Sequence, residues 1–188
     1  MIKIAIVFHS GYGHTKVIAD AVVRGALATE KANITMMEYN KVDFNILNDA
    51  DAIIFGCPTY MGSVSAELKT FMDSTSDAWR HQKWRNKIAA GFTNSSAYSG
   101  DKLGTLMQMV LFAAQHGMIW VGLDLMAGNS SSKGSNEDLN RIGSWVGLMA
   151  QSNTDQGAEL APPLSDRRTA EYFGKRIVEV TQKFKREE

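Results

Sequence analysis

The chain has 188 residues, 44% of them hydrophobic and 21% charged, which is ordinary for one globular domain with a sizeable core. Its 20 basic and 20 acidic residues balance, so no net field favours binding to nucleic acid or to an anionic membrane surface. The single cysteine excludes an internal disulfide, and no signal peptide or membrane-span-length apolar run is recognisable. We therefore expect a cytoplasmic protein without membrane insertion.

Short apolar runs alternate with stretches of helical periodicity. The runs predict strands, buried on both faces, at 2–8, 34–39, 51–56, 87–93 and 118–121. Spacings of three and four predict helices around 18–25, 68–79, 103–114 and 170–184. This alternation predicts an α/β fold, with a doubly wound five-stranded parallel sheet and helices on both faces. The flavodoxin-like order 2-1-3-4-5 is favoured, and it would place a ligand beyond the carboxyl ends of the strands.

One segment does not fit a minimal five-strand domain. Residues 122–165 lack a clear period and are rich in Gly, Ser and Asn, so we interpret 1–188 as a single domain with a long insert. The insert carries apolar Trp145, Val146, Leu148 and Met149. These side chains either pack on the subunit's own core or cover a neighbouring subunit. We predict the second, in a tetramer of twofold symmetry.

The loop after the first strand is the strongest local signal. Its backbone N–H groups and the following helix dipole favour a phosphate, although ordinary βα turns have similar sequences. Gly13 is followed by His14, which excludes the Gly-Lys-Ser/Thr of a P-loop, and Lys16 replaces the third glycine of a dinucleotide fingerprint. The remaining pattern suits a phosphate monoester such as that of FMN. The residues predicted to hold it are Ser10, Gly11, Tyr12, Gly13, His14 and Thr15.

Two further polar loops follow strands at the same sheet edge. The loop after the third predicted strand lies where an isoalloxazine ring would sit if the phosphate is at 10–15. The loop after the fourth is dense in short hydrogen-bonding side chains, which also occur in plain turns. The candidate ring-binding residues are Pro58, Thr59, Tyr60, Met61 and Gly62 in the first loop and Thr93, Asn94, Ser95, Ser96, Tyr98 and Ser99 in the second.

Two more side chains are candidates for the space over the ring. Trp79 ends a predicted helix, where its spacing also fits a core role, and His116 follows another helix, where it could simply be a C-terminal cap. The four histidines show no metal-ligand spacing with carboxylates or with Cys57, so we predict no metal.

The combined motifs resemble the WrbA-type NAD(P)H:quinone oxidoreductases of the flavodoxin-like superfamily. The resemblance is carried by 10–15, 58–62, 68–73 with Trp79, 92–93 with the polar loop that follows, and 116–118 with 121–123. It implies non-covalent FMN, a homotetramer, and two-electron transfer from NAD(P)H to quinones, with both substrates using one site in turn. By position, 10–15 would hold the phosphate, 59–61 and 94–99 the ring, and Trp79 and His116 would act as catalytic residues bordering the substrate pocket.

The sequence departs from that family at three places. Gln115 precedes His116 where paired histidines are common, Tyr98 is unusual in its loop, and 124–142 is longer and more polar than expected. The rival interpretation is a flavodoxin, a single-electron carrier. Flavodoxins are usually acidic, so the balanced charge and the apolar insert favour the enzyme. A flavin-fold regulator without catalysis is a third, weaker interpretation.

Overall fold

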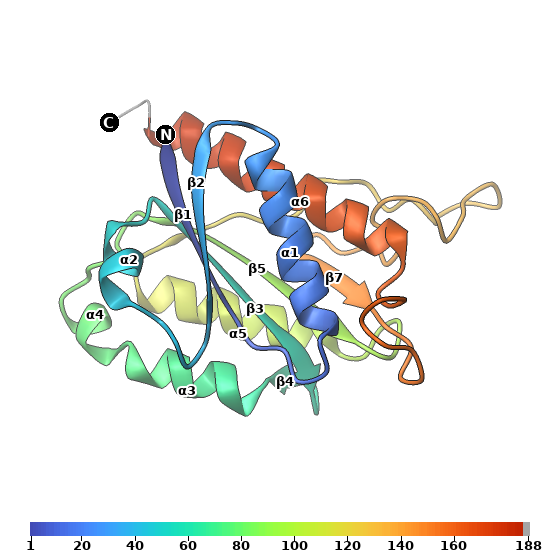
Figure 1. Ribbon diagram of the computed structural model, residues 1–188, viewed down its shortest axis with the longest axis horizontal. Coiled ribbons are helices and arrows are strands. Elements are labelled where there is room, and N and C mark those ends of the chain that lie inside the picture. The colour runs from blue at the N-terminus through green and yellow to red at the C-terminus, as the bar shows by residue number, and fades with distance from the viewer. Residues whose placement is uncertain (186–188) are drawn as a thin grey trace.

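The computed structural model describes residues 1–185 as a largely parallel sheet between two helical layers (Figure 1). The strands are β1 (Ile2–Phe8), β2 (Ala32–Glu38), β3 (Ala52–Tyr60), β4 (Ser63–Val64), β5 (Ile88–Ser95), β6 (Ile119–Trp120) and β7 (Leu148–Gln151). The helices are α1 (His14–Leu27), α2 (Phe44–Asp49), α3 (Ala66–Ser74), α4 (Ser76–Arg80), α5 (Lys102–Gln115) and α6 (Leu164–Lys185).

The strand order is β2-β1-β3-β5-β6 with parallel pairing throughout, which confirms the predicted order and fold class. The predicted number of strands was too low, because the described sheet has seven. β4 forms a short antiparallel pair with β3, and β7 pairs in parallel with β5. β6 pairs with β5 at Ile88 and Ala89, whereas β7 pairs with it from Phe92 to Ser95. Two separate segments therefore fill the position of the expected fifth strand.

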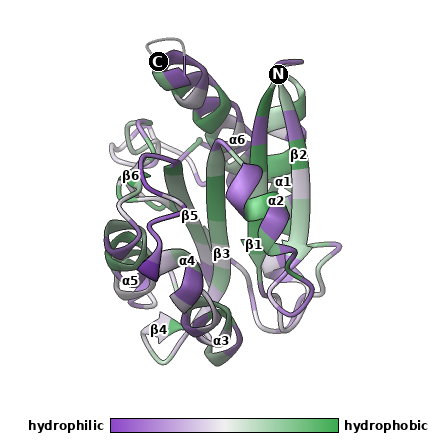
Figure 2. Ribbon diagram, turned by 90° about the vertical axis from the view of Figure 1, so that its left-hand side faces the viewer, coloured by the Kyte–Doolittle hydropathy of each residue, from purple (hydrophilic) through white to green (hydrophobic). Residues whose placement is uncertain are grey.

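The central strands are the most uniformly hydrophobic segments (Figure 2), because both of their faces are covered. Ile4 and Ile6 pack toward α1 and α6, while the alternate residues Ala5 and Val7 pack toward α2 to α5. α1 and α6 cross in close contact. A Cβ atom at Gly25 would lie 1.8 Å from the carbonyl oxygen of Glu171, so glycine is required for this approach.

The helix starts are not all capped alike. Asp43 accepts a hydrogen bond from the N–H of Asn45 and caps α2, and Ser65 accepts one from the N–H of Leu68 and caps α3. The residue before α1 is Gly13, in a left-handed conformation (φ 90°), and it offers no side-chain cap. The first N–H groups of α1 therefore remain available to another acceptor.

The insert between β6 and β7 contains no helix or strand. Leu148 is fully buried in the chain's own core, because it pairs with Phe92 in the sheet, so its predicted burial between subunits is wrong. Val146 and Met149 also pack partly on the chain's own core, while Trp145 is 52% exposed. The predicted single helix at 68–79 is broken at Thr75 into α3 and α4. No helix within residues 1–185 is long and apolar enough to cross a membrane.

Candidate cofactor site

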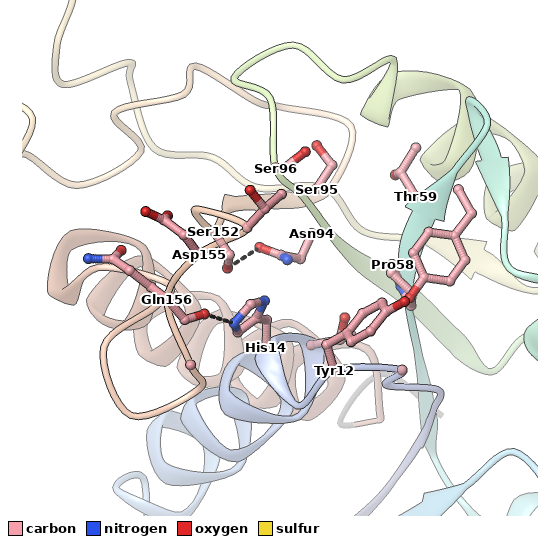
Figure 3. Close-up of a pocket in the computed structure, with 15 residues that line it drawn as sticks. Tyr12, His14, Pro58, Thr59, Asn94, Ser95, Ser96, Ser152, Asp155 and Gln156 are labelled. Carbon is pink, nitrogen blue, oxygen red and sulfur yellow. Dashed lines mark hydrogen bonds between the residues drawn. The ribbon is translucent and has the colours of Figure 1, made fainter.

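A cavity of about 670 Å³ lies at the carboxyl ends of β1, β3 and β5, the edge where the sheet order predicts a ligand (Figure 3). Three of the segments that line it are the loops expected from the sequence, and the fourth follows β7. The lining residues are Gly11, Tyr12, His14, Thr15, Pro58, Thr59, Tyr60, Asn94, Ser95, Ser96, Ser152, Thr154, Asp155, Gln156 and Gly157.

One end of the cavity is formed by the start of α1. Within residues 1–185, no group accepts a hydrogen bond from the backbone N–H of any residue from Gly11 to Thr15. The first turn of α1 carries no acidic residue, and the hydroxyl-bearing Thr15 is 2% exposed. Lys16 turns back, its N–H donating to the Ser10 hydroxyl at 3.1 Å and its ammonium pairing with Asp20. Unpaired N–H groups at a helix start whose first turn carries no carboxylate fit a phosphate group.

His14 ties this loop to the segment after β7. Its Nε2 lies 2.8 Å from the carbonyl oxygen of Gln156 (Figure 3), so Nε2 carries the proton and donates. Gly11 lies close to Tyr60, since a Cβ atom there would be 2.5 Å from the Tyr60 hydroxyl. These contacts fix the phosphate end against two other loops.

The middle of the cavity rests on a cluster of buried threonines. The hydroxyl of Thr59 lies 2.8 Å from the hydroxyls of both Thr93 and Thr105. Thr93 has no exposed surface, so it contacts Thr59 rather than the cavity. Nearby, burial raises the pKa of the Cys57 thiol to about 12, so this cysteine stays protonated and unreactive near neutral pH.

The other end of the cavity is lined by polar side chains. Oδ1 of Asn94 accepts a hydrogen bond from the Ser152 hydroxyl at 3.0 Å, which leaves the amide NH₂ of Asn94 without a partner among the described residues. The N–H of Ser152 donates to the carbonyl oxygen of Ser95 at 3.0 Å. The free amide donor of Asn94 suits a carbonyl oxygen of a flavin pyrimidine ring.

Not every candidate residue lines the cavity. Ser10 and Gly13 shape the phosphate loop, and Gly62 has a positive φ (74°) in the turn after β3. Tyr98 and Ser99 line a separate cavity, and Met61 lines one that adjoins the first. Whether these residues touch a bound cofactor stays a prediction.

The structure places Trp79 and His116 away from the cavity. α5 has 14 residues, spans roughly 21 Å, and returns the chain from the carboxyl end of β5 to the amino end, where His116 lies. His116 is 1% exposed, stacks on Trp84 at 4.4 Å and has Nε2 2.9 Å from the Thr75 hydroxyl. Within one chain, His116 therefore does not border a substrate pocket, contrary to the expectation from the sequence. Trp79 is 48% exposed and is not among the residues that line the cavity.

The sequence analysis missed the lining segment that follows β7. Ser152, Asp155 and Gln156 enter the cavity from a part of the insert that has no periodicity. The available signal was the apolar run 145–150 followed by polar residues, which repeats the strand-then-polar-loop pattern of the other three segments.

A second cavity of about 560 Å³ adjoins the first and shares Gly11, Tyr12, Thr59 and Tyr60 with it. Its own lining is His9, Met61 and Glu67. Nδ1 of His9 lies 2.9 Å from the Ser65 hydroxyl and 3.5 Å from Oε2 of Glu67. Burial lowers the pKa of His9, although the Glu67 charge opposes this shift. No group of three or more His, Cys, Asp or Glu side chains in the described chain is placed to hold a metal ion.

Comparisons with known proteins agree with this geometry. Residues 44–132 match the family model described as NADPH-dependent FMN reductase. A Pseudomonas aeruginosa protein named flavodoxin FldP is 40% identical over 97% of this chain and 98% of its own. An NAD(P)H dehydrogenase (quinone) of Archaeoglobus fulgidus is 32% identical over 97% of this chain and 99% of its own.

Among solved structures, a flavodoxin, WrbA-like protein from Agrobacterium tumefaciens is 35% identical. It covers 98% of this chain and 99% of its own, with a TM-score of 0.74. The matched relatives span nearly the whole chain, and the cavity offers a phosphate cradle at one end and a polar ring site at the other. The chain belongs to the WrbA-type, flavodoxin-like family, and its cofactor is FMN.

Proposed function

We propose that the protein is an FMN-dependent oxidoreductase that transfers two electrons from NAD(P)H to a quinone by a ping-pong mechanism. The observation that carries the proposal is the second cavity, which shares four residues with the cofactor cavity. It offers space next to the cofactor for a planar substrate. A carrier that only docks on a protein partner needs no such space.

Bound FMN would supply the group that accepts a hydride and passes it on. The chain's own part is to bind and orient. The start of α1 would hold the phosphate, while Thr59 and Asn94 would fix the ring end. Burial raises the pKa of Tyr60, so its hydroxyl remains a hydrogen-bond donor near neutral pH. His9, whose Nδ1 is held by Ser65, has Nε2 free among the described residues to carry a proton for the substrate.

The second candidate function is a single-electron carrier. It is favoured by the name flavodoxin of the P. aeruginosa relative at 40% identity. Against it stand the zero net charge and the adjoining cavity. A homotetramer and a cytoplasmic location belong to the first proposal and are supported by the resemblance to WrbA-type proteins.

Anaerobic mixing of the FMN-loaded protein with NADH and with NADPH tests the proposal. Rapid bleaching of the flavin band by either, with parallel initial-rate lines when quinone is varied, is expected for the enzyme. A flavin that neither nucleotide reduces would favour the carrier.

A cavity-filling variant locates the substrate. Met61→Trp adds a bulky ring at the second cavity and should raise the KM for quinone more than it weakens FMN binding. Met126→Trp, at another exposed methionine in the insert, is the matched control. The same KM for quinone in both variants would show that the second cavity does not bind the substrate.

A further inference from the structure

Lys102 is a lysine with no exposed surface, at the first residue of α5. Its Nζ donates to the Ser95 hydroxyl at 2.9 Å, to the carbonyl oxygen of Ala97 at 2.7 Å and to that of Tyr98 at 2.8 Å. The three N–H groups of the ammonium are thus all used, and every acceptor is neutral. The ammonium organises the loop after β5 from the inside.

No carboxylate pairs with this charge in the described part of the chain. The carboxylate whose charge acts on Lys102 is that of Asp166 on α6, which is itself paired with Arg141 through contacts of 2.8 and 3.0 Å. Burial lowers the pKa of Lys102 to about 8, the Asp166 charge opposing this shift and the Arg141 charge adding to it. Below that pH, Lys102, Arg141 and Asp166 together carry one net positive charge in the interior.

This charge lies one hydrogen bond behind the cofactor cavity. Ser95, which accepts from Lys102, also lines the cavity between Asn94 and Ser96. The loop is held from its other side as well, because the side-chain amide of Gln151 donates to the carbonyl oxygen of Ser96 at 2.9 Å. The turn is tight, since a Cβ atom at Gly100 would lie 2.2 Å from the Ser95 hydroxyl oxygen. The loop is therefore held by hydrogen bonds from both sides, and Lys102 supplies three of them.

We propose that Lys102 is a positioning residue of the cofactor site, which holds the 95–98 loop against the ring of FMN and favours the reduced, anionic form of the cofactor over the oxidised form. Oxidised flavin is neutral in its ring system, whereas reduced flavin carries a negative charge on the pyrimidine side near neutral pH. A buried cation close to that side stabilises the reduced form selectively, because charges interact strongly where water is excluded. The inference depends on FMN binding, not on the identity of the electron donor or acceptor.

Two substitutions separate the parts of this role. Lys102→Met removes the hydrogen bonds and the charge, and should weaken FMN and riboflavin alike by about tenfold or more. Lys102→Gln keeps hydrogen-bond donors without the charge, and should retain more of the affinity. Both variants should lower the midpoint potential of bound FMN. A tenfold change in the ratio of affinities for the two redox forms is about 30 mV for a two-electron couple.

Lys87 provides a matched control. It is a half-buried lysine at the opposite edge of the sheet, and its ammonium donates to the carbonyl oxygens of Asn48 and Ala50. Lys87→Met should lower the unfolding temperature while leaving flavin affinity and potential unchanged. Lys102 variants that match the parent in both riboflavin affinity and potential would overturn the proposal.

The parent protein offers a test that needs no variant. A negative charge on the reduced cofactor should raise the pKa of Lys102, so reduction just above pH 8 should take up an additional fraction of a proton, at most one per two electrons. Absence of this extra proton uptake overturns the charge role even if both Lys102 variants fail to fold. Failure of NAD(P)H to reduce the flavin would count against the enzyme and leave this inference intact.

Discussion

The guanidinium of Arg141 and the carboxylate of Asp166 form a two-pronged ion pair, with Nε–Oδ1 at 2.8 Å and Nη2–Oδ2 at 3.0 Å. Their side chains are 3% and 2% exposed. The pair joins the insert to α6, and the same guanidinium donates to the Tyr98 hydroxyl at 3.0 Å and to Oε1 of Gln151 at 3.1 Å. The insert is thereby fastened to the loop after β5 and to β7.

Arg141→Met should lower the free energy of unfolding by about 3–5 kcal/mol, because it leaves the Asp166 charge buried without its partner. Arg24→Met, which breaks the exposed pair with Glu171, should change it by at most about 1 kcal/mol. Urea unfolding of both variants measures the difference. Equal losses would mean that the buried pair contributes no more than a surface pair.

Thr15→Ala should weaken FMN by roughly 10- to 150-fold, because a hydrogen bond to a charged group contributes about 1.5–3 kcal/mol. Riboflavin, which lacks the phosphate, should lose little. Titration of the apoprotein with each flavin gives both affinities. Thr29→Ala, near the other end of α1, is the control and should change neither. A similar loss for both flavins would remove the phosphate from the start of α1.

His116 predicts a pH dependence of stability. Burial lowers its pKa from 6.5 to about 4, and its Nδ1 has no hydrogen-bond partner within residues 1–185. The unfolded state therefore binds more protons than the folded state between these values. The contribution of neutral His116 to the free energy of unfolding is fully present above pH 6.5. It falls as the pH drops toward 4, by up to about 3 kcal/mol.

The parent's free energy of unfolding, measured from pH 7 to 4, should fall more steeply than that of His116→Gln. His81→Gln, at an exposed histidine, should follow the parent. Parallel curves for His116→Gln and the parent would contradict the assignment.

The proposed tetramer has a candidate contact surface on α5. Leu103, Met107 and Leu111 are 52%, 42% and 62% exposed and lie four residues apart, so they form one apolar stripe. The double substitution Met107→Glu with Leu111→Glu should reduce the mass found by light scattering, while Leu27→Glu on α1 should not. A parent that is monomeric at micromolar concentration would reject the assembly.

The sheet order could be predicted because β1, β3 and β5 are short apolar runs that only a covered parallel sheet explains. The phosphate loop could be predicted because its glycines and hydroxyls are local in sequence. The segment at 152–157 could not, because β7 has only four residues and is held by non-local contacts such as Gln151 N–H to Asp166. His116 was misplaced because helix length, rather than residue type, decides the edge at which it lies.

The place of a fifth strand beside β5 is divided between β6 and β7, and this division also shapes the edge of the sheet. One full-length strand there would present a continuous row of unpaired backbone groups, onto which another chain could add. The two segments instead have two and four residues, and the chain leaves the sheet between Val121 and Gly147. The insert thus interrupts the template for edge-to-edge aggregation along the β6 and β7 edge of the sheet.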